Sequence, residues 1–385
     1  MGRMLSIILF FKVLLGDVEV IEVSGEFEGI NNESWYAMSC GGLQVNVESI
    51  YLTNKNKLYI QSRINPGEVQ VIETNINGES DFKLTRVLDT ESSIYFSLFP
   101  GDGRYYLSKV NKQNMSTVRI IEKHGAQGRL NHFNNKVYAS GLYWPLYIEY
   151  LDNFRNHGPE KVTGEARVNF NTLFKQHEGF TVSVYDSSLN LIDSINTLSR
   201  KGENAAGFNM LYLSQPCDIG KNGDVLLIDN DQGYVVEIFN AGGELKREFN
   251  IANSAFTPVP LVLNEESATE LRRSSNKYSI VYALYEDSGI IMTSFFQSVK
   301  QPGLPDPPFH YDLHTTGGDF MVSGESKYPI VGEDENGMVF FFKVIEGGWF
   351  QVDRLFLVGL TIQDIVKEGA MTERIDTAVN QYVSE

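Results

Sequence analysis

Three side chains with metal-binding chemistry stand close together in the last part of the chain. The stretch reads His310-Tyr-Asp312-Leu-His314. Side chains alternate between the two faces of an extended strand, so His310, Asp312 and His314 would share one face. Two imidazoles and a carboxylate suit zinc or iron with open coordination positions. The alternative is a polar, solvated loop after a run of prolines. This stretch is the strongest candidate for a divalent metal, and we expect no other cofactor.

A cluster of aromatic residues is the second candidate site, as a surface that binds a ligand. If these side chains are exposed, they would suit stacking on sugar rings or contact with a protein partner. If they are buried, they pack the interior of a long loop. The four residues are Tyr143, Trp144, Tyr147 and Tyr150.

Two acidic stretches have the composition of a calcium loop or of a tight turn. Asp229-Asn-Asp231-Gln-Gly233 begins like a calcium loop, but the twelfth position, residue 240, is Asn instead of Glu. We therefore interpret it as a hairpin turn between two strands. Asp334-Glu-Asn-Gly337 has the same turn composition just before a strand.

Hydrolase or lyase chemistry would need a histidine, a carboxylate and a tyrosine or arginine to converge on one site. The remaining histidines fall in predicted linkers or in a predicted insertion, and their spacing pairs none of them with an acid. They are His124, His132, His157 and His177. The sequence also lacks a nucleophile elbow, a phosphate-binding loop and a nucleotide fingerprint. Catalysis is therefore the less favoured interpretation.

The segment from Leu213 to Ile251 contains the clearest structural pattern of the chain. Short strand-like runs are separated by turns that include Asn222-Gly223 and Gly242-Gly243. Asn-Gly and Gly-Gly accept the positive φ angles that two-residue hairpin loops require. Four strands in roughly 40 residues is the size of one β-propeller blade.

Weaker versions of the same unit recur, each marked by a turn followed by a strand. The six turns are Asn54-Lys-Asn56, Asp102-Gly103, Asn134-Asn135, Asn222-Gly223, Asp287-Ser-Gly289 and Asn336-Gly337. We therefore predict an all-β fold, a six-bladed β-propeller of four-stranded antiparallel blades that spans residues 17–360.

The spacing of the six turns predicts two insertions, at residues 143–178 and 301–327. The second contains the prolines between Pro302 and Pro308, which exclude a central strand there. Residues 361–385 have helical spacing interrupted by Gly369, which predicts a short helical tail. Asp17 to Val23 would pair with the last blade and close the ring, because closure removes exposed sheet edges.

The blade residues resemble those of NHL-like six-bladed propellers, as in exported Bacteroidetes propeller proteins. The segment from Pro216 to Asp229, followed by Tyr234 to Phe239, is similar to that family's order of proline, turn glycine, strand and aspartate. Two glycine-rich segments, Lys123 to Phe133 and Arg200 to Phe208, resemble its linkers between blades. The resemblance implies a fold and leaves activity open, because the fold hosts binders, scaffolds and enzymes. The lipoprotein cysteine usual in the family is missing.

Charge and the N-terminus limit the partners and the location. A formal net charge of −17 argues against nucleic acid as a partner, since such proteins carry a basic face. Residues 1–16 have the order of a signal peptide, which predicts a periplasmic or cell-surface protein, and otherwise a cytoplasmic one. Their apolar run is too short to span a bilayer, and we expect no integral membrane segment. Cys40 and Cys217 are expected as small buried residues, with one disulfide as the alternative.

These observations predict a non-enzymatic binding or scaffold protein of the cell envelope. It would recognise a protein or a glycan through loops on one face of the ring, helped by the two insertions. The alternative is a metal-assisted hydrolase or lyase with His310, Asp312 and His314 at the mouth of the propeller channel.

Overall fold

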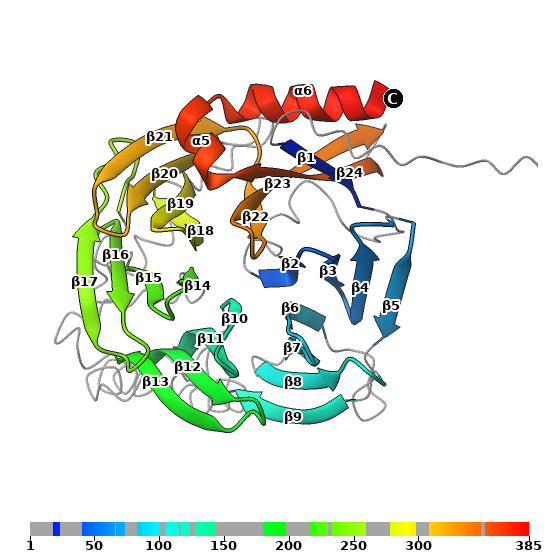
Figure 1. Ribbon diagram of the computed structural model, residues 1–385, viewed down its shortest axis with the longest axis vertical. Coiled ribbons are helices and arrows are strands. Elements are labelled where there is room, and N and C mark those ends of the chain that lie inside the picture. The colour runs from blue at the N-terminus through cyan, green and yellow to red at the C-terminus, as the bar shows by residue number, and fades with distance from the viewer. Residues whose placement is uncertain are drawn as a thin grey trace, which may run out of the picture.

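Six four-stranded antiparallel sheets stand around a central axis in the computed structural model, which makes the chain a six-bladed β-propeller (Figure 1). The structure describes residues 18–23, 41–65, 67–73, 83–99, 105–114, 117–123, 128–143, 180–197, 216–229, 233–258, 278–297, 308–347 and 351–384. The predicted fold class is confirmed.

The first five blades follow the chain, each from its innermost to its outermost strand. The first is β2 (Leu43–Val45), β3 (Ser49–Asn54), β4 (Lys57–Ser62) and β5 (Val69–Glu73), and the second is β6 (Lys83–Asp89), β7 (Ser93–Phe99), β8 (Tyr105–Asn111) and β9 (Thr117–Lys123). The third is β10 (Leu130–Phe133), β11 (Lys136–Tyr143), β12 (Phe180–Asp186) and β13 (Leu191–Thr197). The fourth is β14 (Cys217–Ile219), β15 (Val225–Asp229), β16 (Val235–Phe239) and β17 (Leu245–Asn250), and the fifth is β18 (Ser279–Asp287), β19 (Ile290–Gln297), β20 (Phe309–Thr315) and β21 (Phe320–Ser326).

The sixth blade joins the two ends of the propeller. Its inner strands are β22 (Ile330–Glu333), β23 (Met338–Gly347) and β24 (Gln351–Thr361), and its outermost strand is β1 (Val18–Glu22) from the start of the chain. β1 runs antiparallel to β24, with Val18 opposite Leu360 and Glu22 opposite Phe356. The predicted pairing of the segment from Asp17 to Val23 with the last blade is therefore confirmed for residues 18–22, while Asp17 lies outside the described residues.

Five of the six predicted turns are hairpins and Asp102-Gly103 lies outside the described residues, but two of the six precede a different strand of their blade than the others do. The strand after Asn54-Lys-Asn56 is β4, and the strand after Asp102-Gly103 is β8. Each is the third strand of its blade, whereas the other four turns precede second strands. The same turn residues suit every hairpin of a blade. A turn therefore marks where a strand begins, but it does not say whether that strand is the second, third or fourth of its blade.

The second predicted insertion, at residues 301–327, is largely wrong. β20 and β21 occupy residues 309–326 and complete the fifth blade. The prolines end at Pro308, directly before the first residue of β20, where a proline is tolerated. The first predicted insertion falls between β11 and β12, inside the third blade, and residues 144–178 lie outside the described part of the chain.

The core consists of six apolar clusters, one between each pair of neighbouring blades. The free thiol of Cys217 belongs to the cluster between the third and fourth blades, as expected for a small buried residue, and Cys40 lies outside the described residues. The cluster between the last and the first blades contains Ile21 of β1, Leu43 of β2 and Phe340 of β23. Each blade therefore depends on both neighbours for its core, and the first blade depends on the last.

The predicted helical tail consists of α5 (Ile362–Glu368) and α6 (Met371–Ser384), which cover the outside of the sixth blade (Figure 1). Gly369 ends α5 with a φ of 58°, a conformation that glycine adopts without strain. Ile375 and Val379 of α6 are fully buried in the cluster between the fifth and sixth blades. The helices thus belong to the core.

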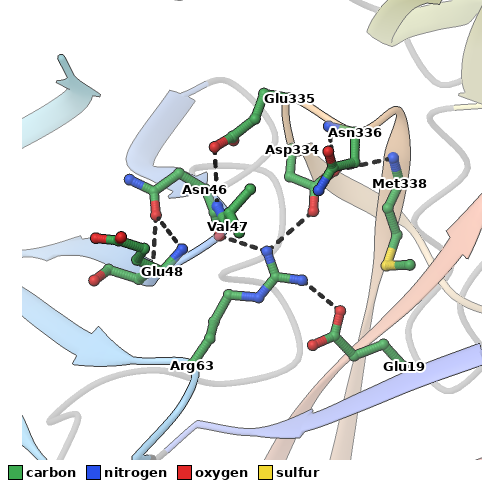
Figure 2. A network of polar contacts seen from close by, with 10 residues as sticks. Glu19, Asn46, Val47, Glu48, Arg63, Asp334, Glu335, Asn336 and Met338 are labelled. Atoms are coloured by element: carbon green, nitrogen blue, oxygen red, sulfur yellow. Dashed lines mark hydrogen bonds and ion pairs between the residues drawn. The ribbon is translucent and has the colours of Figure 1, made fainter. Parts of the chain in front are cut away.

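Arg63 is a polar clamp at the closure of the ring (Figure 2). It follows β4 of the first blade and donates hydrogen bonds to Glu19 of β1 and to Asp334, the latter at 3.0 Å. The three side chains are only 7%, 10% and 1% exposed. Asp334 Oδ1 also accepts the backbone N–H groups of Asn336 and Met338, which fixes the hairpin turn predicted there.

We predict that Arg63→Met destabilises the protein by about 3–5 kcal/mol, because it leaves Glu19 and Asp334 buried without their cation. Lys246→Met is the matched control, since Lys246 and Asp224 form an exposed ion pair at 2.6 Å whose loss costs up to about 1 kcal/mol. Urea unfolding of the three proteins measures both effects. Equal losses in the two variants would contradict the role of the clamp.

Candidate functional site

A cavity of about 500 Å³ lies where the six innermost strands end, at the centre of the ring. Every blade contributes to its lining, and most of the contributed side chains are polar or charged. One or two lining residues from each blade, in chain order, are Asn46, Asp89, Arg129, His132, Asp218, Glu286 and Glu333. This volume is typical of pockets that hold small molecules.

Arg129, which directly precedes β10, provides positive charge inside the cavity. It donates a hydrogen bond to the carbonyl of Leu284 at 3.3 Å, and its guanidinium lies 4.5 Å from the centroid of the Tyr285 ring. Burial alone would lower the pKa of Arg129, but Tyr285, Asp218 and Glu333 raise it above its ordinary value. Arg129 therefore stays charged at any physiological pH.

Two carboxyl groups, those of Asp218 and Glu333, interact electrostatically with Arg129. Asp218 of β14 is 8% exposed and accepts the backbone N–H of Glu286 at 2.7 Å. Burial raises the pKa of Asp218, and Arg129 opposes this rise. Burial also raises the pKa of Glu333 well above its ordinary range, with the negative charge of Asp218 as the next cause. Within the described residues, no group donates a hydrogen bond to the Glu333 carboxylate.

Other carboxylates near the cavity are held in structural ion pairs. Asp89 lies 2.7 Å from Lys112 and accepts a hydrogen bond from Asn46 at 2.8 Å. Asp287, beside Glu286, is paired with Lys221 of the fourth blade. Asp89 thus stabilises its own blade, and Asp287 links the fourth blade to the fifth.

His132 belongs to β10 and lines the same cavity, whereas the sequence interpretation placed it in a linker. The strand begins at Leu130, so only residues 124–129 connect the second and third blades. Desolvation by the surrounding protein lowers the pKa of His132, which leaves the imidazole neutral at pH 7. The ring therefore brings a histidine, an arginine and carboxylates to one cavity, although their sequence spacing gave no sign of it.

The residues of the predicted metal site lie elsewhere, in the interior of the fifth blade. His310, Asp312 and His314 are all buried on β20 and face the same side, as the alternation of a strand predicts. The alternative of a solvated loop is wrong. Both oxygens of Asp312 accept the side-chain amide of Asn253, at 2.9 and 3.0 Å.

The two imidazoles of β20 pack against aromatic rings. His310 is stacked on Phe295 with 4.7 Å between ring centroids, and His314 lies between Phe249 and Phe320. Alternate residues of one strand are about 7 Å apart, too far to share a metal without bending toward it. In the described part of the chain, no three His, Cys, Asp or Glu side chains are placed to hold a metal ion. The structure therefore does not bring the predicted ligands together.

The aromatic cluster is only partly described. Tyr143 is the last residue of β11, while Trp144, Tyr147 and Tyr150 lie outside the described residues. Its role in binding stays a prediction. No helix in the described residues is long and apolar enough to span a bilayer.

No protein-family model and no curated protein sequence matches the chain. Several solved structures have a similar fold at low identity. A chain in the crystal structure of a mitotic checkpoint complex is 12% identical with a TM-score of 0.45, and the match covers 89% of this chain and 93% of that one. A protein of unknown function from Bacteroides caccae is 10% identical with a TM-score of 0.39, over 75% and 82% of the two chains. BamB from Moraxella catarrhalis is 9% identical with a TM-score of 0.35, over 84% and 83%. Such distant likenesses carry no argument about function.

We predict that Glu333→Gln raises the melting temperature at pH 8 and that the gain shrinks as the pH falls. The raised pKa means that the native state holds the proton of Glu333 over a pH range in which the unfolded state has lost it. Stability therefore falls as the pH rises above about 4.3, the ordinary pKa of glutamate, and glutamine removes this loss.

The control for this pH series is Glu248→Gln, on the exposed outermost strand of the fourth blade. It changes the net charge by the same amount far from the cavity, so no comparable gain is expected. Melting curves at several pH values compare the variants. A gain at Glu333 that is equal at pH 4.5 and pH 8 would contradict the assigned cause.

Proposed function

We propose that this chain is an NHL-like binding propeller of the cell envelope, without catalytic activity, which recognises a protein partner at the mouth of the central cavity. The observation that carries this proposal is the cavity itself, which all six blades line. A surface built from the ends of six separate strands is rigid, and rigid elements present a binding site with little loss of entropy on association.

The residues at the rim of the cavity favour a protein partner over a glycan. Glu91 and Glu335 are exposed there, and Glu335 accepts the backbone N–H of Val47, a residue that is 47% exposed. Carboxylates next to an exposed apolar side chain match the mixed polar and apolar character of protein interfaces. Sugar rings are bound mainly on aromatic faces, which suits the cluster from Tyr143 to Tyr150 better than this rim.

The location in the cell envelope is part of the same proposal. It rests on the order of residues 1–16, with Arg3 before an apolar run and a small residue after it. These residues lie outside the described part of the chain.

We expect a photo-crosslinking amino acid at Glu91 or Glu335 to capture one discrete protein partner in cells that make this protein. The same amino acid at Gln70, on the exposed outermost strand of the first blade, is the control and captures no such species. Mass shifts on denaturing gels report the result. Capture from Gln70 alone, or from none of the three positions, would overturn the proposed partner site.

A second candidate function is hydrolase or lyase chemistry in the same cavity. It is favoured by His132, a neutral imidazole that lines the cavity together with Arg129 and Glu333. A neutral histidine is a suitable general base, and an arginine can stabilise a developing anion. Turnover of ester or glycoside substrates by the wild type, lost in His132→Ala, would place this function first.

A further inference from the structure

The charges in the cavity do not balance within the described residues. Asp89 and Asp334 also line it, but Lys112 and Arg63 neutralise them. Glu91 and Glu335 of the lining are exposed, and Lys221 of the lining is paired with Asp287. Of the less exposed lining residues, Asp218, Glu286 and Glu333 remain, with Arg129 as the cation among them. When these three carboxyl groups are ionised, one guanidinium cannot balance their charge, so ionisation leaves an excess of negative charge at the centre of the ring.

Arg129 cannot turn to satisfy all of these carboxyl groups. Its hydrogen bond to the Leu284 carbonyl and its position over the Tyr285 ring hold the guanidinium against the fifth blade. Asp218 and Glu286 are bonded to backbone N–H groups: Asp218 Oδ2 to that of Glu286, and Glu286 Oε1 to that of Gly289 at 2.7 Å. Glu333 has no such donor among the described residues, and its carboxyl group lines the open volume of the cavity.

We propose that the cavity binds an organic cation, a primary ammonium or guanidinium group, which forms an ion pair with Glu333 and is further attracted by Asp218 and Glu286. The inference deepens the proposed binding function and rests on it for the role of the site. An ammonium or guanidinium carries several N–H donors, so one group can satisfy carboxylates that lie on different blades. A bare metal ion needs ligands that converge on a point, and the described residues offer no such group of three.

The volume of the cavity agrees with an organic ligand. At about 500 Å³ it exceeds the space that one ion or one water molecule needs. The same cationic chemistry has two sources, a lysine or arginine side chain of a protein partner and a free polyamine. Both would place positive charge beside Glu333.

Binding of a cation is coupled to the protonation of Glu333. The charged groups that act on it are Asp218 on β14, Lys221 between β14 and β15, Glu286 and Asp287 on β18, and Arg129 before β10. A cation favours the ionised carboxylate, so it displaces the proton that Glu333 otherwise retains. Affinity is therefore highest at alkaline pH and falls as the pH drops through the raised pKa of Glu333.

The test is isothermal titration of the wild type, Glu333→Gln and Glu248→Gln at pH 8 and low salt. The cationic probes are spermidine and the blocked tripeptides acetyl-Gly-Lys-Gly-amide and acetyl-Gly-Arg-Gly-amide. The acetyl-Gly-Gln-Gly and acetyl-Gly-Glu-Gly amides are the neutral and acidic controls. Titrations in two buffers of different ionisation enthalpy measure the protons released.

We expect at least one cationic probe to bind the wild type with release of protons, and the neutral and acidic probes not to bind. Glu333→Gln should weaken binding by about tenfold or more, equivalent to about 1.4 kcal/mol, while Glu248→Gln changes it less than about twofold. The melting temperature of Glu333→Gln shows that this variant is folded. Absence of cation binding to the wild type, undiminished binding to folded Glu333→Gln, or preference for the acidic probe would each overturn the inference.

The arms of the experiment separate the source of the cation from the proposed function. Binding of the tripeptides supports the inference and a protein side chain as the ligand. Binding of spermidine alone supports the inference with a free polyamine as the ligand, and it counts against a protein partner. If the crosslinks at Glu91 and Glu335 form but no cationic probe binds, the inference fails and the proposed function stands.

Discussion

The closure of the ring is the constraint on which the rest of this structure depends. The paired residues of β1 and β24 lie more than 330 positions apart in sequence, yet the pairing runs along the whole length of β1. The pairing carries Glu19 to Arg63, and Arg63 in turn holds Asp334, the residue next to Glu333. Without closure, the first and last blades would each expose one side of an apolar cluster. The cavity would also lose the wall that Glu333 provides.

A propeller brings the ends of its innermost strands together, so any charge placed there meets charges from other blades. In this chain the neighbouring blades supply much of the compensation. Arg63 of the first blade reaches Asp334 of the sixth, and Lys221 of the fourth reaches Asp287 of the fifth. These contacts do two things at once, since they neutralise a carboxylate and fix the spacing between blades. Each of these contacts lies at one interface between blades, whereas Arg129 acts both on Asp218 of the neighbouring fourth blade and on Glu333 of the sixth blade, across the axis.

Local sequence signals predicted the strands well because a blade is a local structure. The turn glycines and alternating apolar residues of the fourth blade gave its strands nearly to the residue, and Gly369 correctly separated the two helices. The fifth blade was misjudged because the prolines before Phe309 suggested a loop that continues through residue 327. β20 begins immediately after them, and its side chains are buried almost without interruption. Its polar residues alternate with apolar ones but are buried as well, whereas their polar composition had favoured a solvated loop.

The site could not be predicted in this way, since Arg129, Asp218 and Glu333 are separated by roughly 90 residues or more and meet only through ring closure. One signal was present in the sequence. Asp89, Asp287 and Glu333 each end the first strand of their blade. An acid repeated at the end of the first strand indicates carboxylates around the axis, but only when it is known which strand of each blade is the first. The histidines of β20 were more conspicuous, but their spacing reflects only the alternation of one strand.

The state of Glu333 distinguishes a structural role from a functional one. A buried carboxylate that serves only the fold is stabilised by a cation or by hydrogen bonds, as Asp334 and Asp312 are. Glu333 stands at the wall of the cavity, where desolvation and the neighbouring acids raise its pKa although Arg129 opposes the rise, and this makes its ionised form unfavourable for stability. A neutral side chain at this position would fold at lower cost. A group whose environment opposes its charge, at the wall of a cavity, is characteristic of a site that acts on something outside the chain. A cationic ligand would place positive charge beside Glu333 in addition to that of Arg129.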